Sequence, residues 1–205
     1  MTRTFALLCS AALMLGLLAY SGLRAFDRAT WMMEVFPVII AMVVMVASYR
    51  RFPLTTLLYV CICVHAVVLI IGGVYTYARV PLGFQIADLL HVERNPYDKI
   101  GHFFQGFVPA LVAREILIRG AHVHGRRMLG FVVICIALAI SAAYELIEWG
   151  VAEMLGQGAD DFLGTQGYVW DTQSDMLMAL IGAVFALLFF ARRHDRQIAA
   201  IQRQG

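Results

Sequence analysis

Long apolar runs separated by short polar connections make up most of this chain. A helix that crosses the hydrocarbon core of a membrane needs about 20 consecutive, mostly apolar residues. Six runs approach or reach this length, and we predict a transmembrane helix in each of 4–23, 33–49, 54–73, 97–118, 128–150 and 171–191. Little chain remains outside them, so the predicted fold is an all-α, polytopic membrane bundle that forms one integral-membrane domain over residues 1–205.

Three segments do not follow this simple pattern. The longest connection, 74–96, contains a short mixed stretch, 84–92, that we interpret as an interfacial or re-entrant helix. The run 4–23 could be a cleaved signal peptide, but the apolar part of a signal peptide has only about 7–15 residues, so we expect a retained helix. The glycine-rich stretch 150–167 could form a lid, although a solvated loop is the favoured interpretation.

Basic residues predict how the bundle is oriented. If the N-terminus is cytoplasmic, eleven of the 16 Lys and Arg residues fall on the inner side and five on the outer side. Because positive charge is enriched on the cytoplasmic side of membrane proteins, both termini are predicted to be cytoplasmic. The inner residues are Arg3, Arg50, Arg51, Arg114, Arg119, Arg126, Arg127, Arg192, Arg193, Arg196 and Arg203.

The overall composition supports a membrane location and excludes some function classes. Hydrophobic residues make up 61% of the chain, against about 45–50% in soluble domains. The net charge is +2 and the arginines are dispersed, so no nucleic-acid partner is expected. All four cysteines lie inside apolar runs, where they behave as small apolar residues, and no disulfide framework is predicted. They are Cys9, Cys61, Cys63 and Cys135.

Three pairs of polar residues interrupt the apolar runs near their ends. The pairs are Asp98 with His102, Glu145 with Glu148, and Asp171 with Asp175. Members of each pair are three or four residues apart, so they share one helix face. In the predicted orientation all three pairs lie on the outer side at similar depth. Ionisable groups near hydrocarbon are costly and usually functional, so we predict that they form one site.

The residue types in this predicted site suit a metal ion. Helical bundles build metal sites from inward-facing carboxylates and imidazoles on separate helices. The ligand set suits Mg²⁺, Mn²⁺, Ca²⁺ or Zn²⁺, and the candidate ligands are Asp98, His102, Glu145, Glu148, Asp171 and Asp175. A bound cation could activate water while a carboxylate acts as general base, which makes Glu145 and His102 the candidate catalytic residues. A lipid or envelope substrate is the expected class.

Simpler interpretations exist for several of these residues. Asn95 and Pro96 are typical of a helix start, so Asp98 and Asp171 could serve only as acids favoured at helix N-termini. Lys99, the only lysine, could pair with an acid or contact a substrate anion, but we expect it to extend toward lipid phosphates.

Two other function classes stay open at this stage. An ion- or proton-coupled transporter component would need polar residues through the membrane, and the first three runs offer only His65 and Glu34. A noncatalytic membrane factor would use the polar residues for folding alone. The sequence contains no nucleophile elbow, phosphate loop, dinucleotide fingerprint or His-Glu-x-x-His zinc motif.

Three segments carry a resemblance to a known family. Glu-Arg-Asn-Pro-Tyr-Asp-Lys-Ile-Gly-His-Phe at 93–103, Tyr-Glu-Leu-Ile-Glu-Trp at 144–149 and Trp-Asp-Thr-Gln-Ser-Asp-Met at 170–176 resemble the YjdF family of bacterial inner-membrane proteins. The similarity extends over most of the chain. It implies a multi-pass protein of the bacterial inner membrane and says little about chemistry.

A fainter resemblance is to the VanZ-like membrane proteins. These combine an Asp-Lys-x-x-His-Phe helix start with a later Glu and an Asp-x-x-Asp helix entry followed by Asn and Gly. Ala179 stands where that pattern has Asn, and the aspartate spacing is looser. The residues that match are Asp98, Lys99, His102, Phe103, Glu145, Asp175 and Gly182.

Overall fold

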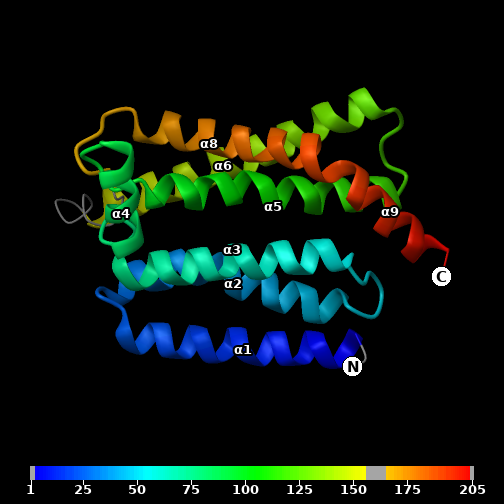
Figure 1. Cartoon of the computed structure of the whole chain (residues 1–205), viewed down its shortest axis with the longest axis horizontal. Coiled ribbons are helices and arrows are strands. Elements are labelled where there is room, and N and C mark those ends of the chain that lie inside the picture. Colours follow the sequence, from blue (N-terminus) through cyan, green and yellow to red (C-terminus); the bar gives the residue numbers. More distant parts are fainter. Residues whose placement is uncertain (1–2, 156–164, 204–205) are drawn as a thin grey trace. The chain divides into compact units, whose positions relative to one another are not determined.

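The computed structural model describes residues 3–155 and 165–203, and the secondary structure of this part of the chain is helical (Figure 1). The elements are α1 (Arg3–Arg24), α2 (Arg28–Ser48), α3 (Thr56–Tyr75), α4 (Pro81–Leu90), α5 (Tyr97–Arg119), α6 (Arg126–Leu155), α8 (Asp171–Phe185), the π-helical turn η2 (Ala186–Phe190) and α9 (Ala191–Gln202). The all-α prediction is confirmed.

Two compact units divide the chain. The first contains residues 1–53 and 63–98, and the second contains residues 54–62 and 99–205. Helices α3 and α5 each begin in one unit and continue into the other. The single-domain organisation stays a prediction.

Within residues 3–155 and 165–203, five helical stretches are long and apolar enough to cross a membrane: α1, α2, α3, most of α6, and the continuous stretch from α8 to α9. Helix α5, which corresponds to the predicted span 97–118, is not among these five stretches. It has 23 residues, which corresponds to about 34 Å of helix, but polar side chains at both ends lower its hydropathy. The multi-pass prediction is confirmed, whereas the location of the termini stays a prediction.

The first unit has an apolar core between α1, α2 and the later part of α3, which lie side by side in Figure 1. Helices α1 and α2 are also joined by a hydrogen bond, which the indole Nε1 of Trp31 donates to Ser21 Oγ over 2.9 Å. The buried core residues are Met14, Leu18, Val35, Val38, Ala66 and Ile70.

Helix α2 begins five residues earlier than the apolar run predicted. Asp27 is its N-cap, and its carboxylate accepts a hydrogen bond of 2.7 Å from the backbone N–H of Thr30. The backbone and side-chain hydrogen bonds from Thr30 lower the pKa of Asp27 below its usual value. A capped polar turn therefore precedes the apolar part of the helix, and hydropathy does not detect it.

A short helix does occur in the longest connection, where we predicted one, although it is α4 at Pro81–Leu90. Asn95 joins it to α5: its Nδ2 donates to Val80 O and its Oδ1 accepts from Tyr97 N–H, both over 3.0 Å. A Cβ on Gly83 would lie only 1.7 Å from Asn95 Oδ1, so a larger residue there would displace the Asn95 side chain that makes these two hydrogen bonds. The predicted role of Asn95 as the cap of α5 is confirmed.

In the second unit, α8 packs closely against both α5 and α6 (Figure 1). Small residues permit the contact with α5. A Cβ on Gly106 would lie 1.8 Å from the carbonyl oxygen of Ala179, and one on Gly182 would lie 2.0 Å from that of Phe103. The two backbones therefore touch, as at small-residue contacts between membrane helices.

Two predicted helix ends are wrong. Helix α6 does not end at Gly150 but continues to Leu155, and the last apolar run continues as helix through η2 and α9 to Gln202. Arginine, alanine and glutamine are good helix formers, so a helix can outlast the apolar segment that crosses the membrane. Residues 156–164 of the predicted glycine-rich loop lie outside the described residues.

Candidate functional site

A lysine bound by two aspartates lies at one end of the second unit. Lys99, in the first turn of α5, places its Nζ 2.8 Å from Asp171 Oδ1 and 2.5 Å from Asp175 Oδ1. Both aspartates are buried and lie four residues apart on α8, which puts them on one face of that helix. The expectation that Lys99 extends toward lipid phosphates is therefore wrong. Two buried carboxylates need a nearby positive charge, and Lys99 supplies it.

His102 lies one turn further along α5 and is 6% exposed. Its Nδ1 is 3.0 Å from Gln105 Oε1 and 3.7 Å from Glu145 Oε1 of α6. Its Nε2 is 3.8 Å from Asp175 Oδ1 of α8. Carboxylates from α6 and α8 therefore flank the ring on two sides.

The second unit thus brings together most of the predicted site residues. Lys99, His102, Glu145, Asp171 and Asp175 form one cluster from α5, α6 and α8, which we call the His102 cluster. Within this cluster, His102 Nε2 and Asp175 Oδ1 are ligand atoms 3.8 Å apart that could share a metal ion. The packing of α5 on α8 explains their approach, because the two backbones touch about one turn further along.

The other two predicted ligands, Glu148 and Asp98, are not among the five residues of the His102 cluster. Glu148 is half-buried and lies one turn after Glu145 on the same face of α6. Asp98 is the last residue of the first unit, and its Oδ2 lies 3.7 Å from Arg94 Nη2. Along α5, Asp98 precedes His102 by one turn.

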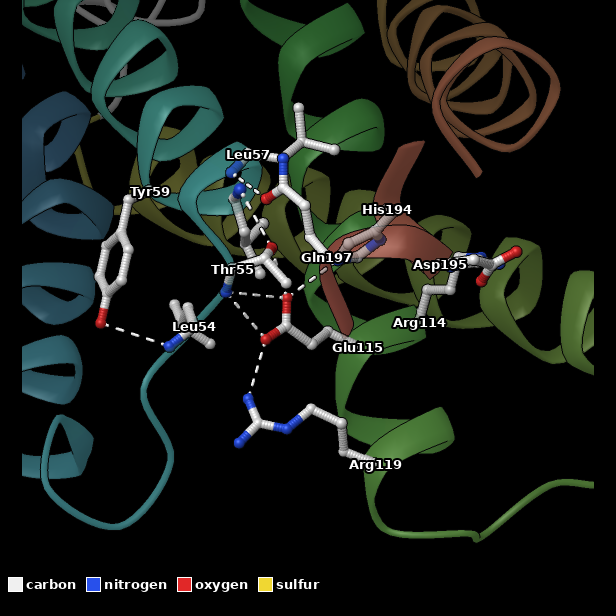
Figure 2. A network of polar contacts seen from close by, with 11 residues as sticks. Leu54, Thr55, Leu57, Tyr59, Arg114, Glu115, Arg119, His194, Asp195 and Gln197 are labelled. Atoms are coloured by element: carbon white, nitrogen blue, oxygen red, sulfur yellow. Dashed lines mark hydrogen bonds and ion pairs between the residues drawn. The ribbon is translucent and has the colours of Figure 1, made fainter. Parts of the chain in front are cut away.

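A second buried polar cluster was missed by the sequence analysis (Figure 2). Its centre is the fully buried carboxylate of Glu115 near the end of α5. The carboxylate accepts hydrogen bonds from the backbone N–H and hydroxyl of Thr55, at 3.0 and 2.8 Å, and from Arg119 at 2.9 Å. His194 Nε2 of α9, also fully buried, lies 2.9 Å from the same carboxylate.

Further polar contacts in this Glu115 cluster hold α9 in place (Figure 2). Arg114 Nη2 is 2.5 Å from Asp195 Oδ1, and the N–H of Leu57 donates to Gln197 Oε1 over 2.9 Å. The sequence signal was available, since Glu115 and Arg119 are four residues apart on one helix face.

The fold and these two clusters define a multi-pass helical membrane protein with buried ionisable groups near both ends of α5. A family model described as "Predicted membrane protein (DUF2238)" matches residues 6–196, and the chain belongs to this family. It is 60% identical over 201 residues to "Inner membrane protein YjdF" of Escherichia coli (strain K12), covering 97% of this chain and 96% of that protein.

These matches confirm the resemblance to the YjdF family and the location in the bacterial inner membrane. No solved structure matches the chain. The inner-membrane location makes the lipid bilayer the environment of the protein.

Proposed function

We propose that the His102 cluster binds a divalent cation and activates water to hydrolyse a lipid or envelope substrate. The observation that carries this proposal is the position of His102 between Glu145 and Asp175, with one ring nitrogen toward each carboxylate. The three residues come from three helices, as in the metal sites of helical bundles.

The hydrogen bond to Gln105 assigns roles to the two ring nitrogens. The amide oxygen of Gln105 is an acceptor, so a neutral imidazole that donates from Nδ1 would present the lone pair of Nε2 toward Asp175. A cation with ligand bonds of about 2.0–2.6 Å can lie between two ligand atoms 3.8 Å apart. Gln105 and Glu145 would then orient the imidazole from its other side, as outer groups commonly do for metal-bound histidine.

The environment supports a membrane substrate. The cluster is buried where α5 and α8 begin, and both helices pass into apolar segments beyond it. A cation there would lower the pKa of bound water. Glu145, which lies on the other side of the His102 ring, would accept the released proton through an intervening water. A lipid-linked substrate has a headgroup at this depth and acyl chains in the bilayer.

Metal content and thermal unfolding test the proposal. The purified full chain is compared with His102→Ala, and with His124→Ala in an exposed loop position as the matched control. We expect near-stoichiometric metal in the wild type and in His124→Ala, and loss in His102→Ala. Added Mn²⁺ or Zn²⁺ should raise the Tm of the first two proteins only. Absence of metal and of any Tm shift in the wild type would contradict the proposal and favour a noncatalytic folding role.

Proton- or ion-coupled transport is the second candidate. A transporter needs polar residues on both sides of the membrane interior, and the Glu115 cluster provides buried ionisable groups at the other end of α5. Ionisable groups occur near both ends of α5, with His102 and Glu115 thirteen residues, or about 20 Å, apart along the helix. Proteoliposomes that enclose a pH-sensitive dye test this candidate. Ion-dependent proton flux that is lost in both His102→Ala and Glu115→Gln would favour transport over hydrolysis.

A further inference from the structure

One carboxylate oxygen of the His102 cluster has two competing neighbours. Asp175 Oδ1 lies 2.5 Å from Lys99 Nζ and 3.8 Å from His102 Nε2. It is therefore both the acceptor for the lysine ammonium and the oxygen best placed to share a cation with His102. Asp175 is only 3% exposed, so water contributes little to balancing its charge.

A divalent cation and the ammonium cannot both approach this oxygen without cost. Two positive charges a few ångströms apart repel each other strongly in a buried environment. Binding of the cation therefore requires Lys99 Nζ to move away from Asp175.

Asp171 provides the position to which the ammonium can retreat. It already lies 2.8 Å from Lys99 Nζ and is one helical turn nearer the start of α8 than Asp175. A small rotation of the flexible lysine side chain would keep this ion pair while Asp175 is released. Asp171 would then hold Lys99, rather than ligate the metal as the sequence analysis expected.

We infer that Lys99 is a built-in competitor of the metal, which occupies Asp175 in the cation-free site and gives it up to the cation when the cation binds. This inference rests on the proposed cation site and adds its regulation. Lys99 compensates the buried aspartates when no cation is bound, and it lowers the affinity of the site so that the cation can exchange.

Mn²⁺ binding to the purified full chain tests the inference. Lys99→Met removes the competing charge, Lys99→Gln does so with a polar side chain, and Lys99→Arg keeps the charge as the control. We expect roughly ten-fold or tighter Mn²⁺ binding in Lys99→Met and Lys99→Gln, and wild-type affinity in Lys99→Arg. In EDTA the two neutral variants should have a lower Tm than the wild type, and Mn²⁺ should restore it.

The variant Asp171→Asn tests whether Asp171 holds the Lys99 ammonium or ligates the metal ion. As an anchor, Asp171 matters only when Lys99 is present, so Asp171→Asn should weaken Mn²⁺ binding several-fold in the wild type but not in Lys99→Met. The inference is overturned if the wild type binds Mn²⁺ through His102 and the neutral Lys99 variants bind no tighter. If neither the wild type nor any variant binds Mn²⁺, the proposed cation site fails together with the inference.

Discussion

Individual side chains decide how the buried charges of this protein are compensated. The spacing of polar residues along the sequence correctly indicated that His102, Glu145 and Asp175 would meet. It did not indicate that Lys99 would point between Asp171 and Asp175. Helix periodicity determines the face on which a residue lies, whereas the rotamer of a long side chain depends on which partners the neighbouring helix presents.

Replacing Glu115 tests whether the Glu115 cluster stabilises the protein. Glu115→Ala leaves Arg119, His194 and the N–H of Thr55 without their buried acceptor. Loss of one partner from a buried ion pair typically costs about 3–5 kcal/mol, so we expect a drop in Tm of several degrees.

Thermal unfolding in detergent, followed by circular dichroism, measures this effect. Glu153→Ala, at an exposed position of α6, is the matched control and should leave the Tm within about a degree. Equal shifts in the two variants would show that Glu115 does not bear the stabilising role assigned to it.

At the scale of elements, hydropathy predicted the apolar part of each spanning helix but not its ends. Helix α2 begins at a polar cap, Asp27, and α9 extends the last span through a polar, arginine-containing segment. Both ends depend on helix propensity and capping rather than on apolar character. Helix α5 is the reverse case, because its polar ends lower its hydropathy although its length suffices to cross a membrane.

The contact between α5 and α8 depends on Gly106. A Cβ there would lie 1.8 Å from the backbone oxygen of Ala179. Because this is a backbone atom, the clash can be relieved only if α5 and α8 move apart. We expect Gly106→Ala to destabilise the protein by about 1–3 kcal/mol and to abolish Mn²⁺ binding, because His102 moves away from Asp175.

Gly130→Ala is the control for this change, since Gly130 is also helical but a Cβ there would meet no atom within 4 Å. It should be neutral, or stabilising by up to about 1 kcal/mol through helix propensity. Thermal unfolding and Mn²⁺ binding distinguish the two variants. Similar behaviour of both would disprove the close-contact argument.

For the whole molecule, the number of spans determines where the termini lie. Among the helices that the structure describes, five stretches qualify as spans by length and composition, and α5 would make six. Six spans place both termini on one side of the membrane, as the distribution of arginines predicts, whereas five place them on opposite sides.

Reporter fusions measure this directly. GFP fused after Gly205 should fluoresce and alkaline phosphatase should be inactive there, because the C-terminus is predicted to be cytoplasmic. Alkaline phosphatase inserted at His91, in the predicted outer connection, should be active. An active phosphatase at the C-terminus would reject six spans with a cytoplasmic N-terminus.

The sequence by itself determined that this is a multi-pass helical membrane protein and that its polar residues gather near helix ends, because the bilayer imposes length and hydropathy and the helix imposes a period of 3.6 residues. Only the tertiary structure decided which charges are paired. The backbone contact at Gly106 brings His102 and Lys99 to the aspartates of α8. Helix α9, which continues the same helical stretch, places His194 beside Glu115. Such pairings join residues far apart in sequence, and helix periodicity carries no information about which helices become neighbours.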